Sequence, residues 1–307
     1  LKIMFWGSNA TPEQLGIIRE LKPDIAIMQF TKQTPEDLAA MAEAGSVKVL
    51  IPHHMDLAMS EDVYLPRIEE MERAFRIGYE MHTLAMKLCR PGIVEREIAG
   101  AIEGDTMSLG SGLSFPSIVS QHGETLHNLN CDGVLEEGRL LLCDAGGETV
   151  NNYCSDHTRT YPVSGRFTEQ QKEIYDIVLA AHDHVARIIK PHMMYTEIHK
   201  AAYLTLAEGL IGVGLIKGSA ADAVASGAMT MFMPHGLGHG LGMDVHDCEA
   251  MGERSFDFST IAERAAKSAT CIYRAAWRIE PGTVLTDEPG LYFIPCLLYT
   301  SPSPRDS

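Results

Sequence analysis

The 307-residue sequence lacks the features of a membrane protein or a nucleic-acid-binding protein. No apolar run reaches the roughly 18 residues that a membrane-spanning helix needs. Lysine and arginine total 25 against 41 aspartates and glutamates, which gives a formal net charge of −16. Such an acidic chain repels the phosphates of nucleic acids and of anionic membranes. We therefore expect neither nucleic acid nor a membrane as a partner.

Paired cysteines and a secretion signal are also missing. The seven cysteines are scattered and odd in number, and no Cys-x-x-Cys pair occurs. This usage favours a reducing cytoplasm, in which each thiol is a small buried residue. The opening LKIMFWGSNA has no basic segment followed by an apolar one, so we expect no signal peptide. The sequence thus predicts a cytoplasmic protein, and its 45% hydrophobic content is typical of a soluble globular one.

Three zones differ in composition along the chain. Residues 1–62 alternate short apolar runs with helical stretches, which indicates an incomplete α/β segment. Residues 63–295 mix long helices and strands without regular βαβ alternation, which predicts an α+β domain. Residues 296–307, rich in serine and proline, differ from everything before them and are expected to be an artefactual tail.

The main zone contains clear helix and strand patterns. Amphipathic periodicity predicts helices over 67–90, 167–190 and 195–216, the first ended by Pro91 and Gly92 and the second capped by Thr168. Strand-like runs occupy 114–121, 138–148, 153–163 and 282–294.

Two aspartates flank the turn between two of these strands. Asp144 ends the apolar run RLLLCD, an unusual place for a charge unless it is paired or bound to a metal. Asp156 follows twelve residues later, and the two face each other in a hairpin whose loop centres on Val150. Opposed carboxylates repel, so a cation should lie between them. An ion pair with Arg159 is the alternative.

The stretch PHGLGHGLGMDVHD, residues 234–247, carries three histidines, His235, His239 and His246. Its His-x-x-x-His spacing is that of a zinc-binding helix. Glycine at every second position argues against a helix, because each costs about 1 kcal/mol in a helix interior. An extended or looping backbone is favoured instead. On this stretch alone, a catalytic site and an ordinary glycine-rich loop both remain open.

A third acidic element is Glu288, which follows the run TVL and precedes a Pro-Gly turn. Carboxylate ligands with a single imidazole favour Mn²⁺, Co²⁺ or Zn²⁺ over a thiolate site. Several carboxylates meeting in one place normally require two cations, and paired metal ions activate water for hydrolysis.

Three stretches resemble, in the same order, the metal-binding motifs of the pita-bread metallopeptidases. They are CDAGGETVNNYCSDHTRTYP, FMPHGLGHGLGMDVHD and LTDEPGLYFIP, and they are most similar to those of the Xaa-Pro peptidases, aminopeptidase P and prolidase. The resemblance covers roughly residues 66–295. It implies an α+β pita-bread fold and two divalent ions per site, most readily Mn²⁺. The implied metal ligands are Asp144, Asp156, His239 and Glu288.

The resemblance also implies roles in catalysis. His235 and His246 would contact substrate and stabilise the tetrahedral intermediate, and Glu288 would also shuttle a proton. His127 and Arg274 would contact substrate. The implied reaction is hydrolysis of the Xaa-Pro bond at the N-terminus of peptides or in dipeptides, by an enzyme that is a homo-oligomer when complete.

The remaining histidines belong to no motif, and most are expected at the surface or on helix faces. They are His53, His54, His82, His122, His157, His182, His184, His192 and His199. His157 should point to the opposite face of its strand from Asp156, because side chains alternate along a strand.

The chain departs from the family in three respects. Its two aspartates are one residue further apart than in most members, so a bulge or a longer loop is expected. PDIAIMQF and KVLIPHHMDL resemble the C-terminal part of a metallo-β-lactamase-fold hydrolase, so a chimeric join near residues 60–70 is an alternative. No glutamate after Glu288 matches the family's fifth ligand. We therefore expect a C-terminally truncated domain that is inactive by itself.

Three other functions are compatible with parts of the pattern. Methionine aminopeptidase shares the fold, but its motif around the metal-binding histidine lacks the DVHD ending. Creatinase-like hydrolases keep the fold without this ligand set. A non-catalytic peptide-binding protein on the fold would have lost ligands, whereas four are intact here.

Overall fold

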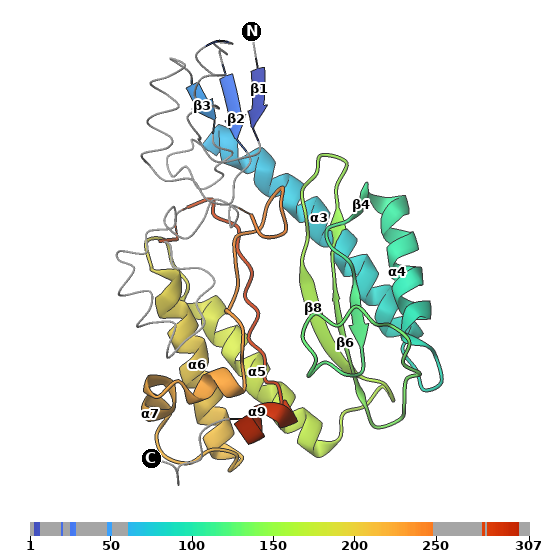
Figure 1. Ribbon diagram of the computed structural model, residues 1–307, viewed down its shortest axis with the longest axis vertical. Helices are drawn as coiled ribbons and strands as arrows, with labels where there is room; N and C mark the ends of the chain where they lie inside the picture. The colour runs from blue at the N-terminus through green and yellow to red at the C-terminus, as the bar shows by residue number, and fades with distance from the viewer. Residues whose placement is uncertain are drawn as a thin grey trace.

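The computed structural model describes residues 3–6, 20, 25–28, 48–50, 61–247, 278–279 and 281–300. Near the N-terminus, three short parallel strands form one sheet in the order β1 (Ile3–Trp6), β2 (Ile25–Met28) and β3 (Lys48–Leu50). Figure 1 shows this sheet at one end of the molecule, beside the start of helix α3 (Glu61–Leu88). Parallel pairing is the pattern of α/β architecture. The boundary at residue 62 stays a prediction.

The first half of the main zone packs two helices against an antiparallel sheet. Helix α3 is followed by α4 (Glu95–Leu109), and the sheet order is β5 (Ile118–Ser120), β6 (Leu140–Ala145), β8 (His157–Pro162). A second pair joins β4 (Gly112–Leu113) to β7 (Gly147–Glu148). Alternate residues of β6, namely Leu141, Cys143 and Ala145, are fully buried in a core shared with α3 and α4. The other face of β6 therefore carries Asp144.

The second half is helical. It contains α5 (Glu169–Ile188), α6 (Tyr195–Gly212), α7 (Ala220–Ala225), the 3-10 helix η1 (Ala228–Met231) and α9 (Pro295–Thr300). Thr168 caps α5 as expected, because its hydroxyl accepts from the Gln171 N–H at 3.2 Å. A second core joins α5 and α6 to Leu237 and Ile279. Every helix in the described part of the chain is too short or too polar to cross a membrane.

The connection between α3 and α4 is repeated one hundred residues later between α5 and α6. Gly92 donates its N–H to the Leu135 carbonyl at 2.8 Å, and His192 donates to the Ile279 carbonyl at 2.6 Å. Both donors have positive φ, 87° and 70°. The two halves therefore share one local plan, in which a left-handed residue turns the chain between paired helices.

Helix α4 is absent from the sequence prediction. Its N-cap position holds Val94, whose side chain cannot accept a hydrogen bond. The Glu97 carboxylate accepts from the Val94 N–H instead, at 2.9 Å. The usual Ser, Thr, Asp or Asn start signal is therefore missing, although the helix forms.

The aspartate hairpin forms, but its register differs from the prediction. Asp144 lies opposite Thr158, not Asp156, so the loop centres on Asn151 and not on Val150. Asp156 is the diagonal neighbour of Asp144 on the same face, because side chains alternate along each strand. The ladder from β6 to β8 continues without a bulge, and the extra residue lies in the turn.

The expected strand over 282–294 is reduced to an isolated bridge between Leu285 and Gly240. Its backbone nevertheless pairs with the histidine segment, as described below. The expected burial of the cysteines holds only in part, because Cys296 is exposed and only Cys143 and Cys154 among the described cysteines are buried.

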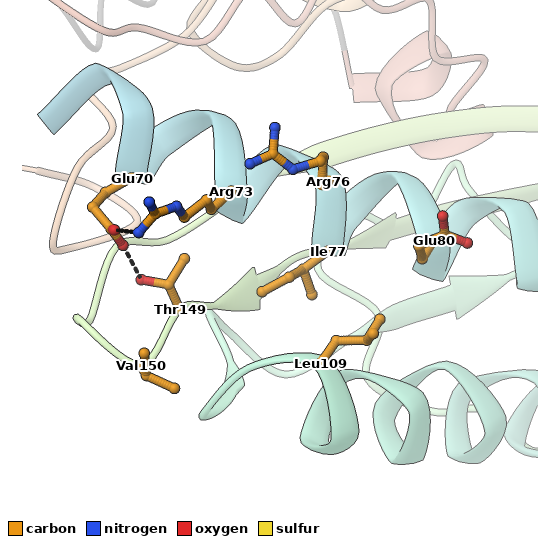
Figure 2. A pocket seen from close by; sticks show the side chains of 8 residues that line it. All are labelled: Glu70, Arg73, Arg76, Ile77, Glu80, Leu109, Thr149 and Val150. Carbon is orange, nitrogen blue, oxygen red and sulfur yellow. Dashed lines mark hydrogen bonds and ion pairs between the residues drawn. The ribbon is translucent and has the colours of Figure 1, made fainter. Parts of the chain in front are cut away.

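A hollow of about 310 Å³ lies between α3, α4 and the tip of the β7–β8 hairpin (Figure 2). At the edge of this hollow, the Glu70 carboxylate accepts hydrogen bonds from the Arg73 guanidinium and the Thr149 hydroxyl. The residues that line it are Glu70, Arg73, Arg76, Ile77, Glu80, Leu109, Thr149 and Val150. None of them is a predicted site residue.

Candidate metal centre

Two extended segments carry His239 and Glu288 side by side. Residues 237–241 run antiparallel to residues 284–288, and Thr286 donates its N–H to the His239 carbonyl at 2.9 Å. Glu288 donates its N–H to the Leu237 carbonyl at 2.7 Å. Figure 1 shows these segments between α5 and the β6–β8 sheet. Gly238 allows this close approach, because a Cβ atom there would lie 2.3 Å from the Thr286 carbonyl oxygen.

The imidazole of His239 lies between two carboxylates. Its Nε2 is 3.3 Å from Asp156 Oδ2 and 3.0 Å from Glu288 Oε1. The ring is held from behind, where Nδ1 is 2.9 Å from the Gly240 carbonyl. His239 is 2% exposed and Asp156 is largely buried, whereas the Glu288 side chain is 35% exposed and can be reached by water. The structure thus brings together side chains from three sequence motifs, with Asp144 beside Asp156 on the neighbouring strand.

The pKa values of these groups are mutually dependent. Burial lowers the pKa of His239, but hydrogen bonds to Asp156 and Glu288 outweigh it and raise that pKa to about 10. Burial opposes ionisation of Glu288 as well, yet contact with His239 leaves its pKa below the ordinary value. Burial and the nearby Asp156 raise the pKa of Asp144 to about 8. Two causes therefore act: burial disfavours every charged form, and the contact between His239 and the carboxylates favours the charged forms of His239 and Glu288.

Asp144 gives a direct test of whether a metal ion fits. Its Oδ1 is buried and has no hydrogen-bond partner among the described residues. Such an oxygen is costly to bury, and ligation by a cation would satisfy it. Three carboxylates and one imidazole form a donor set that suits Mn²⁺, Co²⁺ or Zn²⁺. The residues present therefore fit a divalent metal ion.

Of the flanking histidines, His246 lies beside Asp156 and His239. Ligand atoms of Asp156, His239 and His246 lie within 4.8 Å of one another, and the two imidazole centroids are 4.2 Å apart. This geometry is compatible with metal ligation as well as with substrate contact. The His235 ring packs edge-on against Tyr292, with centroids 5.2 Å apart.

The two remaining sequence-predicted residues are not brought to the cluster. His127 is exposed on the loop after β5, with φ 53°, and no described contact joins it to the carboxylates. Arg274 lies outside the described residues. Arg159, the alternative partner for the aspartates, lies opposite Cys143 and so belongs to the other face of the sheet.

Asp287 turns away from the cluster towards α5. Its Oδ2 is 2.7 Å from His182 Nδ1. On an extended segment, neighbouring side chains point in opposite directions, so Asp287 and Glu288 cannot share one face. His182 is exposed, in agreement with its expected place at the surface.

Three histidines outside the motifs are buried or packed inside. His157 points away from Asp156 as expected and packs against Phe75, with ring centroids 5.6 Å apart. His82 is 5% exposed and its Nε2 is 2.8 Å from the His157 carbonyl. His199 is fully buried, and its Nδ1 accepts from the Leu237 N–H at 3.3 Å. His82 and His199 lie on helix faces as expected, but on buried ones, because an isolated histidine carries no sequence signal of its tertiary contacts.

Two residues that contact the cluster or its backbone, Thr286 and Tyr195, are not predicted by the sequence. The Thr286 hydroxyl accepts from the His239 N–H at 2.9 Å and donates to Glu288 Oε1 at 2.5 Å. Its position two residues before Glu288 places it on the same face of an extended segment, a signal that could have found it. The Tyr195 hydroxyl donates to the Thr286 carbonyl at 2.7 Å. No local pattern marks Tyr195, because its partner lies 91 residues away.

Comparison with known proteins places this chain in a family. The sequence model of metallopeptidase family M24 matches residues 69–302. Xaa-Pro aminopeptidase of Escherichia coli K12 is 34% identical over 273 residues, which are 88% of this chain and 56% of the relative. Xaa-Pro aminopeptidase 1 of Streptomyces coelicolor is 38% identical over 201 residues, 65% of this chain and 37% of the relative. The chain thus spans about half the length of the curated relatives it matches.

Solved structures of aminopeptidase P have the same fold as this chain. Proline aminopeptidase P II from Yersinia pestis superposes with a TM-score of 0.70 at 30% identity, covering 95% of this chain and 66% of that protein. Aminopeptidase P from E. coli with the inhibitor Pro-Leu gives 0.69 at 30% identity, covering 93% and 67%. The α+β architecture is therefore the pita-bread fold. The chain belongs to metallopeptidase family M24.

Proposed function

We propose that this chain carries most of a divalent-metal centre that hydrolyses the Xaa-Pro bond at the N-terminus of peptides or in dipeptides. The observation that carries the proposal is the position of His239 Nε2, 3.0–3.3 Å from carboxylates of two other motifs. The proposed metal ligands are Asp144, Asp156, His239 and Glu288. The orphaned Oδ1 of Asp144 supports them.

The metal is proposed to be Mn²⁺, with Co²⁺ and Zn²⁺ as alternatives, two ions per site in the complete protein. E. coli aminopeptidase P with a similar fold has been solved in a zinc-substituted form in complex with product. When bound, such ions lower the pKa of water and stabilise negative charge that develops on a carbonyl oxygen. The oxygen-rich donor set supports this choice over a softer metal.

The chain's own residues would bind and orient the substrate and move protons. Glu288, hydrogen-bonded to Thr286, would accept and return a proton beside the reacting carbonyl. His246, beside His239, would donate a hydrogen bond to the developing oxyanion. His235, at the other end of the same segment, would contact the substrate and also stabilise the tetrahedral intermediate. His127 and Arg274 are proposed to contact the peptide.

Proline-containing peptides are proposed as substrates because of the relatives. The two curated relatives described above are named Xaa-Pro aminopeptidases, and one solved neighbour holds the inhibitor Pro-Leu. We further propose a cytoplasmic location, which the free state of the five described cysteines supports. A homo-oligomer and the domain boundaries at residues 62 and 295 are likewise proposed.

The test supplies the one ligand that the sequence does not offer. The chain is fused after its Glu-Pro-Gly turn to the sequence that follows this turn in the E. coli relative, and Mn²⁺ is added. Cleavage of Xaa-Pro peptides is expected, with little cleavage of Met-Xaa peptides or creatine. An Asp156→Asn variant of the same fusion is the matched control. Preference for Met-Xaa peptides, or equal turnover by the control, would refute the proposal.

A further inference from the structure

Tyr195 connects helix α6 to the segment that carries Glu288. It is the first residue of α6, and its side chain is almost completely buried, at 1% exposure. The hydroxyl donates to the Thr286 carbonyl at 2.7 Å. A buried hydroxyl needs such a partner, and here the partner is the backbone two residues from a proposed metal ligand.

Gly238 makes room for this contact. A Cβ atom at residue 238 would lie 2.4 Å from the Tyr195 hydroxyl and 2.3 Å from the Thr286 carbonyl oxygen. Both distances are far below van der Waals contact. The tyrosine hydroxyl therefore occupies space that any larger residue at 238 would contest. Three parts of the chain meet here: α6, the histidine segment and the glutamate segment.

Thr286 is hydrogen-bonded to two of the proposed metal ligands, His239 and Glu288. Its N–H donates to the His239 carbonyl, and its hydroxyl accepts from the His239 N–H, each at 2.9 Å. The same hydroxyl donates to Glu288 Oε1 at 2.5 Å. A shift of the Thr286 peptide would therefore move both His239 and Glu288 relative to Asp156.

We propose that Tyr195 is a positioning residue for the metal centre, and that its hydroxyl fixes the Thr286 peptide so that His239 and Glu288 face the aspartates. The inference rests on the proposed function, since it concerns the same ligands. Partners behind metal ligands commonly change metal affinity about 10–100-fold when they are removed. A tyrosine that only fills the core would change stability and leave metal affinity unaltered.

Tyr203 provides the matched control. It lies on the same helix, is fully buried, and its hydroxyl donates to the Met233 carbonyl at 3.0 Å. Met233 belongs to the helical core and is not a proposed ligand. Tyr195→Phe and Tyr203→Phe thus each delete one buried hydroxyl-to-carbonyl hydrogen bond, and only the Tyr195 bond ends on Thr286, the residue that is hydrogen-bonded to both His239 and Glu288. The Tyr203 ring packs on His199, and Tyr203→Phe keeps that ring.

The experiment titrates Co²⁺ into the 307-residue chain and follows the visible absorption, which reports both affinity and ligand geometry. Thermal melts of the metal-free variants measure the structural cost. We expect Tyr195→Phe to bind Co²⁺ about tenfold more weakly with an altered spectrum, and Tyr203→Phe to bind like wild type although its melting point falls equally.

Equal Co²⁺ affinity and identical spectra for the two variants would overturn the positioning role while leaving the proposed site in place. A Tyr195→Phe chain that no longer folds would assign the hydroxyl to folding and also overturn it. Absence of Co²⁺ binding by the wild-type chain would overturn the proposed metal site itself, and this inference with it.

Discussion

Replacing Thr286 by valine removes one hydroxyl and nearly preserves the side-chain shape. That hydroxyl is the acceptor for the His239 N–H and the donor to Glu288 Oε1. Water cannot readily replace the lost hydroxyl as the acceptor for the His239 N–H, because His239 and Thr286 are only 2% and 7% exposed. The variant should therefore lose stability and metal affinity together.

The magnitude follows from the buried N–H group. Leaving it without an acceptor costs about 1–3 kcal/mol. For a domain of this size, each kcal/mol lowers the melting temperature by about 2–4 °C, so a loss near 2 kcal/mol corresponds to about 4–8 °C. Thermal melts of the metal-free chain measure this. Metal affinity, measured by calorimetry, should fall about 10-fold or more.

Thr205→Val is the control. The Thr205 hydroxyl donates to the Ala201 carbonyl within α6 at 3.1 Å, a contact that contributes little to helix stability. Its melting temperature should stay close to that of the wild type. A Thr286→Val melting temperature within about 1 °C of this control would refute the argument that Thr286 couples the two ligands.

Three further outcomes are expected. The pKa of His239 is raised from 6.5 to about 10, so the stability that its protonated form contributes is complete below pH 6.5 and lost as the pH rises to about 10. Thermal melts of the metal-free chain at a series of pH values measure this loss. The His239→Gln variant should not show it. Gly238→Ala should cost about 1–3 kcal/mol through overpacking, whereas Gly100→Ala, on open helix surface, should gain about 0.5–1 kcal/mol; urea midpoints of the two variants decide. In the fusion that supplies the fifth ligand, His246→Ala should lower kcat about 10²–10³-fold with metal content retained, and loss of metal would instead make it a ligand.

Local patterns predict the three longest described helices, α3, α5 and α6, and the existence of the aspartate hairpin. The run RLLLCD and the asparagine turn have short-range causes, namely alternation and turn propensity. The register of the hairpin could not be predicted in this way. Moving the turn centre by one residue places Asp156 diagonally to Asp144 and no longer directly opposite it, and no residue pattern in this stretch distinguishes the two registers. Asp144 therefore faces Thr158, although both aspartates share one face as expected.

Residues that support the site from a distance could not be predicted. Tyr195 and His199 look like ordinary helix positions, and their partners Thr286 and Leu237 are set by how α6 packs on the two extended segments. Asp144 stood out in the sequence because a charge at the end of an apolar strand is costly to bury unless a cation compensates it. The ligand roles proposed for Asp156, His239 and Glu288 come from the resemblance to the family motifs. Tertiary packing alone determines which neutral side chains hold them.

The central claim is that Asp144, Asp156, His239 and Glu288 form one metal centre, and a metal titration tests it most directly. Calorimetry with Mn²⁺ on the dialysed 307-residue chain should give at most one weakly bound ion, because no glutamate follows Glu288 to complete the ligand set. Asp156→Asn should abolish this binding. Asp176→Asn, an exposed carboxylate on α5, should leave it unchanged. Equal Mn²⁺ binding by wild type and Asp156→Asn would contradict the account.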